Sequence, residues 1–221
     1  MRAKSLRVLT EAGQGKKKSE RQDGMSQPRK PVQPGPPRLA AREVRIIGGR
    51  WKRSKLPVAD KPGLRPTPDR VRETLFNWLG QDLDGWRVLD AFAGSGALGF
   101  EAASRGAAEV LLLERDADLV RSLNNSRAKL GAEQLRVEAS DALAWMARAP
   151  AQRFELVFLD PPFAAGLFEP ALRAAAPLLV EGGYLYLESP EAIAVPPECG
   201  LTLWREARAG AVHYCVLRRS G

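Results

Sequence analysis

The chain has 221 residues, 44% of them hydrophobic and 27% charged, which is typical of a soluble globular protein with one domain and an appendage. It contains no apolar run near the ~18 residues that a membrane span requires, and its basic N-terminus lacks the apolar stretch of a secretory signal. Its two cysteines, Cys199 and Cys215, lack metal-ligand spacing and cysteine or histidine companions. We therefore expect a cytoplasmic protein with reduced structural thiols, no membrane partner and no metal.

The net charge of +8 is unevenly distributed along the chain. Residues 1–42 hold 11 Lys or Arg and 3 Asp or Glu, residues 43–75 hold 9 and 4, and residues 76–221 hold 14 and 19. This basic front end favours a polyanionic partner such as RNA or DNA, although a solvated tail that only aids solubility has the same composition. Residues 1–42 are also rich in proline and poor in large apolar residues, which predicts a disordered basic tail.

Residues 43–80 predict a basic hairpin followed by a helix. Val44–Ile47 and residues 51–58 have the apolar pattern of two short strands, and a glycine pair separates them. Thr67 has the chemistry of a helix N-cap, and the proline after it suits the first helical position, where its missing N–H is not needed. Apolar residues at helical spacing follow, and Gly80 ends the predicted helix.

Residues 81–221 alternate between short apolar runs and helical segments, which predicts an α/β domain with a mainly parallel sheet and helices on both faces. The expected strands are Arg87–Ala91, Glu109–Glu114, Leu135–Glu138, Leu156–Asp160 and Tyr184–Glu188. The expected helices are Leu98–Ser104, Ala117–Leu130, Ala142–Arg148 and Leu167–Leu179. The last two runs, Leu201–Ala207 and Val212–Arg218, have no helix between them and predict an antiparallel hairpin at the sheet edge.

Acidic residues recur where the predicted strands end. The set consists of Asp90, Glu114, Asp141, Asp160 and Glu188. Ligands of open α/β sheets bind beyond the carboxyl ends of the strands, so we expect these acids at one rim. An acid at such a place can simply cap the next helix, a role that suits Asp116 and Asp141. Five like charges at one rim nevertheless need a partner, which predicts a cationic ligand that carries hydroxyls and amines.

The loop from Asp90 to Gly99 satisfies the pattern G-x-G-x-x-G between a predicted strand and a predicted helix. Its glycines allow the backbone to approach a ligand closely at a helix N-terminus. Glu114 follows Gly94 by 20 residues, where a carboxylate can accept hydrogen bonds from two ribose hydroxyls. These features predict an adenosine-containing cofactor without choosing between NAD and S-adenosylmethionine.

The tetrapeptide Asp160-Pro161-Pro162-Phe163 follows the fourth predicted strand of the sheet. Its prolines fix φ and lack N–H donors, which leaves a stiff corner with exposed carbonyl groups. An exocyclic base amine is a poor nucleophile, and the Asp160 carboxylate and the Pro161 carbonyl can orient it by accepting hydrogen bonds from its protons. Phe163 can stack on the base. Hydride transfer has no use for this arrangement, so the motif favours S-adenosylmethionine and methylation of a base amine.

From about Val44 to Arg219 the chain resembles class I methyltransferases, and more closely the RsmD-type enzymes, which methylate the N2 amine of a guanine in 16S ribosomal RNA of the small subunit. The matching segments are Arg45–Gly49, Leu64–Thr67, Asp69–Glu73, Asp90–Gly99 and Asp160–Phe163. The resemblance implies a Rossmann-like fold with a seven-stranded, mostly parallel sheet and an antiparallel C-terminal hairpin. Two departures are Ser54, where the family often has glycine, and Pro68, where threonine is more usual.

The resemblance also implies roles for individual residues. The target guanine would be held by Asp160, Pro161, Pro162 and Phe163. The cofactor S-adenosyl-L-methionine would be bound by Asp90, Phe92, Ala93, Gly94, Ser95, Gly96, Glu114, Arg115, Asp141, Ala142 and Asp160. RNA phosphates would be bound by a basic block that also covers the cofactor: Arg45, Arg50, Lys52, Arg53, Lys55, Arg65, Arg70 and Arg72.

We expect in-line methyl transfer to ribosomal RNA or the small ribosomal subunit by a monomer, with positioning as the main contribution and no metal or covalent intermediate. The only histidine, His213, is expected to be structural. Three alternatives remain open from the residues. They are a methyltransferase acting on DNA adenine or another RNA base, an NAD(P)-dependent oxidoreductase, and an RNA-binding module whose methyltransferase body is inactive.

Overall fold

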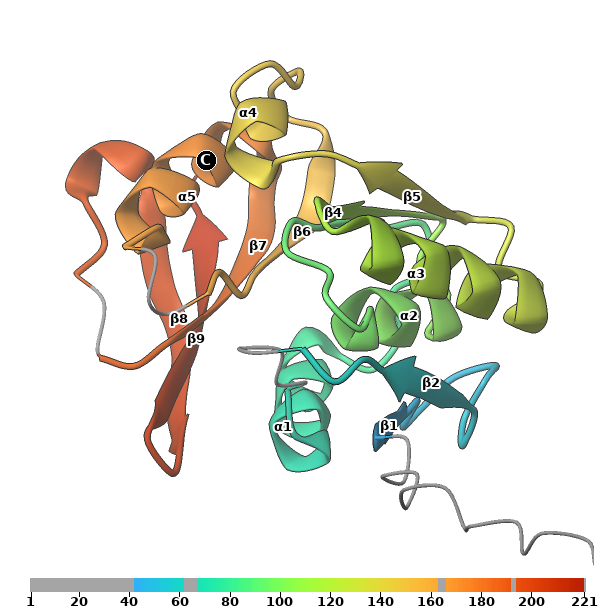
Figure 1. The fold of residues 1–221 in the computed structure, drawn as a ribbon. Helices are drawn as coiled ribbons and strands as arrows, with labels where there is room; N and C mark the ends of the chain where they lie inside the picture. Colours follow the sequence, from blue (N-terminus) through green and yellow to red (C-terminus); the bar gives the residue numbers. More distant parts are fainter. Residues whose placement is uncertain (1–41, 62–66, 163–165, 192–193, 221) are drawn as a thin grey trace, which may run out of the picture. The chain divides into compact units, whose positions relative to one another are not determined.

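A seven-stranded sheet in the order β5-β4-β3-β6-β7-β9-β8 carries the fold in the computed structural model (Figure 1). Strands β3 to β7 are all parallel to one another, whereas β9 is antiparallel to both β7 and β8. The predicted sheet type and its antiparallel C-terminal hairpin are therefore confirmed. The strands are β3 (Arg87–Asp90), β4 (Glu109–Glu114), β5 (Leu135–Ala139), β6 (Phe154–Leu159), β7 (Leu179–Ser189), β8 (Leu201–Ala209) and β9 (Val212–Arg219).

The structure describes residues 42–61, 67–162, 166–191 and 194–220, all within a compact unit that extends from Arg38 to Gly221. The predicted tail therefore lies outside the described residues, apart from Arg42. No helix among the described residues is long and apolar enough to cross a membrane.

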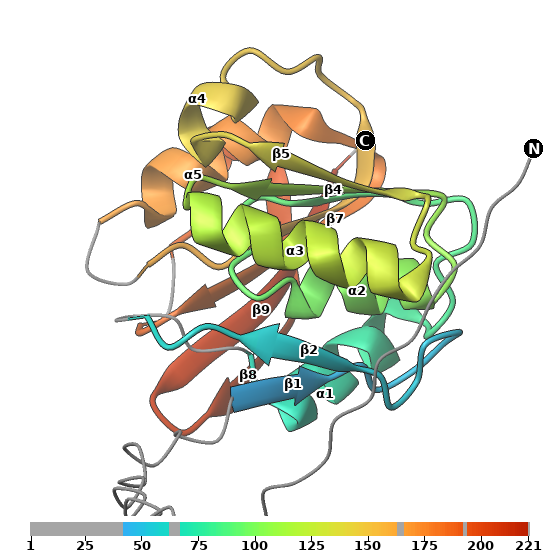
Figure 2. The same cartoon turned by 45° about the vertical axis from the view of Figure 1, so that its right-hand side comes forward.

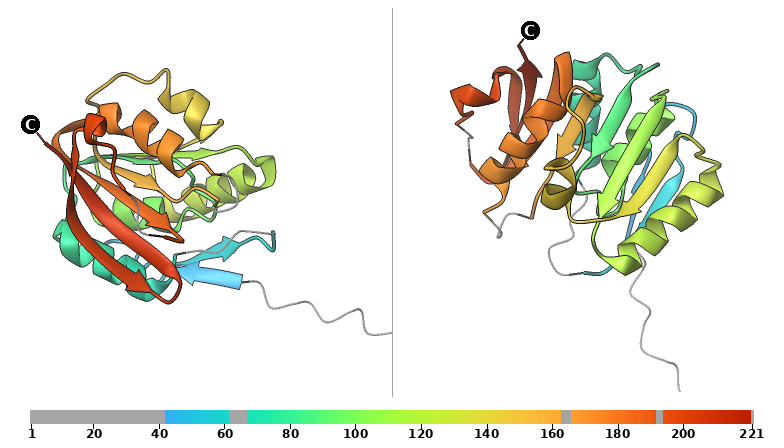
Figure 3. Two further views of the ribbon diagram at one scale, coloured as in Figure 1. Left: turned by 90° about the vertical axis from the view of Figure 1, so that its left-hand side faces the viewer. Right: turned by 90° about the horizontal axis from the view of Figure 1, so that it is seen from above.

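Helices cover both faces of the sheet (Figure 3). One face packs against α1, α2 and α3, and the other packs against α4 and α5. The central strands contact helices on both sides, which explains why their sequences are continuously apolar rather than alternating. The helices are α1 (Asp69–Leu79), α2 (Ala97–Ser104), α3 (Ala117–Leu130), α4 (Ala142–Met146) and α5 (Phe168–Ala175), with short 3-10 helices at Ala176–Leu178 and Pro197–Cys199.

The predicted N-terminal hairpin exists as β1 (Arg42–Arg45) and β2 (Lys55–Val58), an antiparallel pair beside α2 and α3 (Figure 2). β1 has the predicted length but begins two residues before Val44, and β2 is shorter than the predicted strand 51–58, because the chain between the two strands forms a closed turn. In that turn the Ile46 N–H donates to the Ser54 carbonyl, and the Arg53 N–H donates to the Ile46 carbonyl. Alternate apolar side chains of the hairpin are buried in the core that also contains α1 and α2.

Two local predictions are wrong. Thr67 does not cap α1, because Pro68 is the N-cap residue and no side chain caps the helix there. The predicted helix Leu167–Leu179 stops four residues early as an α-helix, and β7 begins at Leu179 instead of Tyr184. The glycine pair at 182–183 lies inside a bulge of β7, where a Cβ on Gly183 would sit 2.9 Å from the Val180 carbonyl oxygen.

Candidate active site

The glycine loop connects β3 to α2 at the carboxyl end of the sheet. Asp90 ends β3 with a nearly buried carboxylate, which accepts a hydrogen bond of 3.0 Å from the Gly99 N–H. Gly99 must be glycine because an added Cβ would lie 2.1 Å from Leu112 on β4. Gly96 is the N-cap of α2 and has a left-handed φ of 79°, which favours glycine. The start of α2 therefore packs tightly against β4, and the close approach of the loop to a ligand stays a prediction.

Glu114 fixes the loop from the neighbouring strand. Its carboxylate accepts hydrogen bonds from the Gly94 N–H at 3.0 Å and from the Asp116 N–H at 2.8 Å. The side chain is half-buried, and each of its oxygens accepts one of these bonds and can accept another. A fixed carboxylate beside a glycine loop with positive φ at Gly94 and Gly96 fits the ribose of an adenosine-containing cofactor. The glycine loop and Glu114 therefore fit the ribose portion of S-adenosylmethionine.

Asp160 follows β6 directly, and β6 is the neighbour of β3 on the side opposite β4. The chain adds β4 and β5 on one side of β3 and then adds β6 and β7 on the other side. The boundary between β3 and β6 is therefore the topological switch point of the sheet. Asp160 is half-buried, Pro161 is buried and Pro162 is exposed. Phe163, the fourth residue of the predicted motif, lies outside the described residues. The first three residues of the motif therefore lie at the rim where the sequence predicted them.

The rim is a place where carboxylates resist ionisation. Burial raises the pKa of Asp90 to about 7; the charge of Glu114 adds to this shift, and the Gly99 N–H opposes it. The pKa of Asp160 lies well above its usual value, because of burial first and then the charges of Glu188 and Asp90. Among the residues that the structure describes, neither Asp90 nor Asp160 has a cationic partner. A ligand with positive charge would relieve this arrangement.

Glu188 is a site residue that the sequence argument placed at the rim without giving it a role. It lies at the end of β7, one position beyond the Leu159–Leu187 pair, and is 5% exposed. Its Oε1 accepts hydrogen bonds from the Thr67 hydroxyl at 2.6 Å and from the Tyr186 hydroxyl at 3.0 Å. Thr67 therefore joins the start of α1 to the rim instead of capping the helix. Only the acid at a strand end signalled this position in the sequence.

The remaining predicted cofactor residues occupy three places, the glycine loop, the start of α4 and the end of β4. Phe92, Ala93 and Ser95 are in the glycine loop, and the Ala93 N–H donates to the Leu113 carbonyl of β4. Asp141 is exposed and caps α4 by accepting a hydrogen bond from the Ala144 N–H, while Ala142 is buried. Asp116 caps α3 in the same way and also pairs with Lys61. The capping roles considered for Asp116 and Asp141 are therefore present. Contacts of Asp141, Ala142 and the exposed Arg115 with a cofactor stay predictions.

The predicted RNA-binding residues are mostly on the surface. Six of them are exposed, namely Arg45, Arg50, Lys52, Arg53, Lys55 and Arg70. Arg65 lies outside the described residues. The prediction that Arg72 binds RNA is wrong. Arg72 has no exposed surface, and its guanidinium binds Glu101, Asp69 and the Thr67 carbonyl. An arginine held in this way within the core cannot bind a phosphate of the RNA backbone.

Comparisons with known proteins agree with this geometry. The family model described as Conserved hypothetical protein 95 matches residues 44–218. The Ribosomal RNA small subunit methyltransferase D of Escherichia coli strain K12 is 44% identical over 184 residues, which cover 80% of this chain and 90% of that protein. The chain belongs to the RsmD-type methyltransferase family. The protein of the same name from Haemophilus influenzae is 43% identical over 182 residues, 78% of this chain and 92% of its own length.

A solved structure from this family has the same architecture. The Escherichia coli protein yhhF superposes with a TM-score of 0.73 at 40% identity, covering 80% of this chain and 98% of that chain. The family match begins at Val44, so it includes most of the basic hairpin as well as the sheet and its rim. The hairpin is therefore part of the RsmD-type fold, whereas the residues before it lie outside the match.

Proposed function

We propose that this chain transfers a methyl group from S-adenosyl-L-methionine to the N2 exocyclic amine of a guanine in 16S ribosomal RNA. The observation that carries the proposal is Asp160-Pro161-Pro162 at the switch point, between the glycine loop and Glu188. Relatives named for ribosomal RNA small subunit methylation support the class of substrate. We further propose that the enzyme acts as a cytoplasmic monomer on ribosomal RNA or on the small subunit.

The residues of the glycine loop and of β4 would hold the cofactor. Glu114 supplies a fixed acceptor for ribose hydroxyls, and Asp90 supplies a buried carboxyl group that attracts a cation. When bound, S-adenosylmethionine supplies an electrophilic methyl group next to a sulfonium charge. The rim acids favour that charge because each of them ionises more readily beside it.

Asp160 and the proline corner would orient the base. The carboxylate and the Pro161 carbonyl accept hydrogen bonds from the amine protons, which turns the nitrogen lone pair out of conjugation with the ring. Fixing two reactants in this way accounts for a large part of the barrier reduction in reactions of this type. A guanine paired in a helix must first be unstacked, at a cost of a few kcal/mol. After transfer the amine loses one proton, which the Asp160 carboxylate can accept.

Calorimetry and mass spectrometry test the proposal. The protein should bind S-adenosylhomocysteine and not NADH, which separates a methyltransferase from an oxidoreductase. Ribosomal RNA from cells without the gene should lack one N2-methylguanine that wild-type cells contain, and purified enzyme should restore it on small subunits. A modified adenine in place of guanine would contradict the assigned target. Absence of methyl transfer by an enzyme that binds S-adenosylhomocysteine would favour the RNA-binding module.

A further inference from the structure

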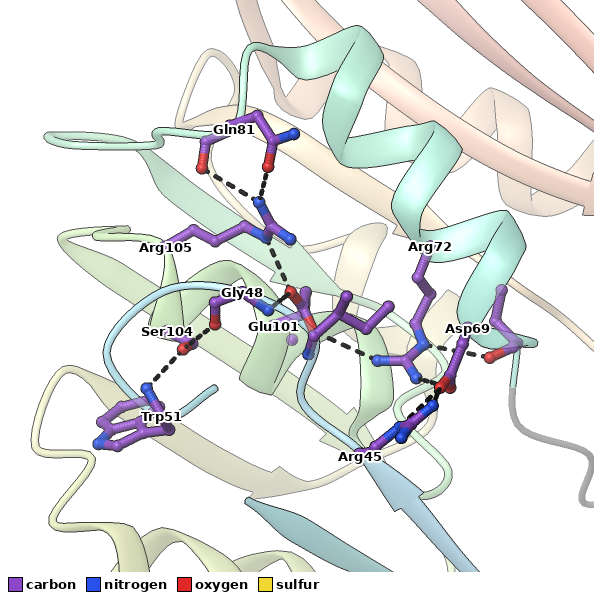
Figure 4. Close-up of polar contacts among 12 residues, drawn as sticks. Arg45, Gly48, Trp51, Asp69, Arg72, Gln81, Glu101, Ser104 and Arg105 are labelled. Carbon is purple, nitrogen blue, oxygen red and sulfur yellow. Dashed lines mark hydrogen bonds and ion pairs between the residues drawn. The ribbon is translucent and has the colours of Figure 1, made fainter. Parts of the chain in front are cut away.

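Helix α2 holds the turn of the basic hairpin through one buried carboxylate (Figure 4). Glu101 has no exposed surface, and its two oxygens accept hydrogen bonds from the N–H groups of Ile47 and Gly48 at 2.7 and 2.8 Å. The same carboxylate binds Arg72 of α1 at 3.3 Å and Arg105 at 2.8 Å. A single side chain of α2 thus connects the hairpin, α1 and the end of its own helix.

Ser104, three residues further along α2, binds the turn a second time. Its hydroxyl donates to the Gly48 carbonyl at 2.6 Å and accepts from the Trp51 N–H at 2.9 Å, while its carbonyl accepts from the Arg50 N–H at 2.7 Å. The contact is so close that a Cβ on Gly48 would lie 2.3 Å from the Arg105 guanidinium. We call Glu101 and Ser104 the α2 anchor. The hairpin uses only backbone atoms in its hydrogen bonds to the anchor. The side chains of the turn are therefore free of the anchor and can contact another molecule.

The cationic side chains of this turn form no ion pairs with the part of the chain that the structure describes. Arg45 and Lys55, on the strands, pair with Asp69 and Glu43. In contrast, Arg50, Lys52 and Arg53 at the turn are exposed and form no ion pair with any residue that the structure describes. We call these three residues the cationic tip. Exposed and unpaired cations on a fixed turn are suited to bind phosphates.

The cationic tip lies away from the rim. Helix α2 begins at the glycine loop and ends at Ser104, where the turn is attached. Eight helical residues span about 12 Å, so the turn is attached roughly that far behind the cofactor loop. Contact with both places requires an RNA that extends well beyond the target nucleotide.

We propose that the α2 anchor consists of positioning residues for RNA, which set the cationic tip at a fixed distance from the cofactor loop. This inference rests on the proposed function. The anchor touches neither the cofactor loop ligands nor Asp160, so it acts on RNA only through the tip. It follows that weakening the anchor raises the KM for RNA and leaves kcat and cofactor affinity unchanged.

A double-mutant cycle tests this route. The variants are Ser104→Ala, the pair Lys52→Gln with Arg53→Gln, and their combination, with the exposed Glu133→Gln as a control. The substrate is the small ribosomal subunit from cells without the gene, and S-adenosylhomocysteine affinity is measured in parallel. We expect Ser104→Ala to raise KM about threefold and the tip pair to raise it about tenfold, with a salt slope reduced by about two. In the combination, Ser104→Ala should add nothing, because the cations it positions are gone.

The outcomes are separable. Equal effects of Ser104→Ala with and without the tip cations would overturn the proposal, as would a wild-type KM for Ser104→Ala. Loss of S-adenosylhomocysteine binding together with RNA binding would show that the anchor is merely structural. Glu101→Gln provides the stronger version of the same test where it folds, and Ser104→Ala decides the matter where it does not. Wild-type enzyme that fails to methylate subunits would instead refute the proposed function.

Discussion

The buried carboxylate of Glu101 and the rim carboxylates of Asp90 and Asp160 have opposite surroundings. Glu101 is enclosed by two arginines and two backbone N–H groups, all supplied by the chain. Asp90 and Asp160 at the rim are also surrounded by protein, but the charges that act on them are those of other acids. Removal from water therefore acts on all three carboxylates, but only Glu101 has positively charged partners that offset it.

The difference separates a structural acid from a binding acid. A buried charge is tolerated when the fold provides its counterions, as at Glu101, where ion pairs to Arg72 and Arg105 and backbone hydrogen bonds together join the hairpin, α1 and α2. A buried acid whose pKa is raised has surroundings that lack such a counterion. A cationic ligand can then supply at the rim the positive charge that Arg72 and Arg105 supply to Glu101.

The largest expected effect is the loss of stability on removing Glu101. Glu101→Ala leaves Arg72 buried without its fully buried partner, and breaking a buried pair in this way costs about 3–5 kcal/mol. Chemical denaturation measures the free energy of unfolding, with the exposed Glu133→Ala as control, expected within about 0.5 kcal/mol of wild type. A loss below about 1 kcal/mol for Glu101→Ala would show that the anchor is not needed for folding.

Asp160→Ala should instead abolish most activity without destabilising the fold. Removing the acceptor that orients the amine is expected to lower kcat by at least ~10²-fold, as misplacement of a reacting group does. Because the pKa of Asp160 is raised by burial and by like charges, its loss should not reduce the free energy of unfolding. Methyl-transfer assays and S-adenosylhomocysteine calorimetry measure both. Wild-type turnover by this variant would remove Asp160 from the mechanism.

Glu114→Ala should weaken cofactor binding. A hydrogen bond to a charged group contributes about 1.5–3 kcal/mol, which corresponds to roughly 10–100-fold in the dissociation constant. The same change also frees the Gly94 N–H and loosens the loop. Calorimetry with S-adenosylhomocysteine gives the value, and Glu133→Ala is again the matched control. An unchanged dissociation constant would exclude Glu114 from the site.

Cofactor affinity should depend on pH through Asp90. The carboxyl group has a pKa of about 7 without ligand, and a bound cation favours its ionised form, so binding releases a proton. Affinity should therefore fall as pH drops below about 7, by up to tenfold per pH unit, and level off above pH 7. Asp90→Asn should weaken this dependence and leave the part that is due to Asp160, whose pKa is also raised. A wild-type affinity that is constant from pH 5.5 to 8 would contradict the cationic role of the rim.

The fold and the rim acids could be predicted from the sequence, whereas the α2 anchor could not. The order of strands and helices, the glycine loop with Glu114 and the Asp160 motif depend on local pattern and on the general geometry of parallel sheets. The anchor depends on contacts between residues that lie about 30 to 55 positions apart. No periodicity signals such a pairing. The family resemblance places Arg72 in the RNA-binding block, and the sequence does not reveal that Glu101 buries it.

Thr67 shows the same limit at a smaller scale. A threonine before a helix is an N-cap by local rules, yet this one donates to Glu188, which is 121 positions away. Thr67 and Arg72 both make contacts with distant segments, Thr67 with β7 and Arg72 with α2. Both lie in the segments Leu64–Thr67 and Asp69–Glu73, which carry the family resemblance.

Arg53 gives the cationic tip an energetic cost. Its φ of 72° lies in the left-handed region, where a residue with a side chain is less stable than glycine by about 1 kcal/mol. A glycine at this position would make the protein more stable and its surface less positive. Gln81 and Gln152 also have a positive φ, but only at Arg53 would a stabilising glycine remove a cation of the tip, so selection for thermal stability at this position should lower RNA affinity.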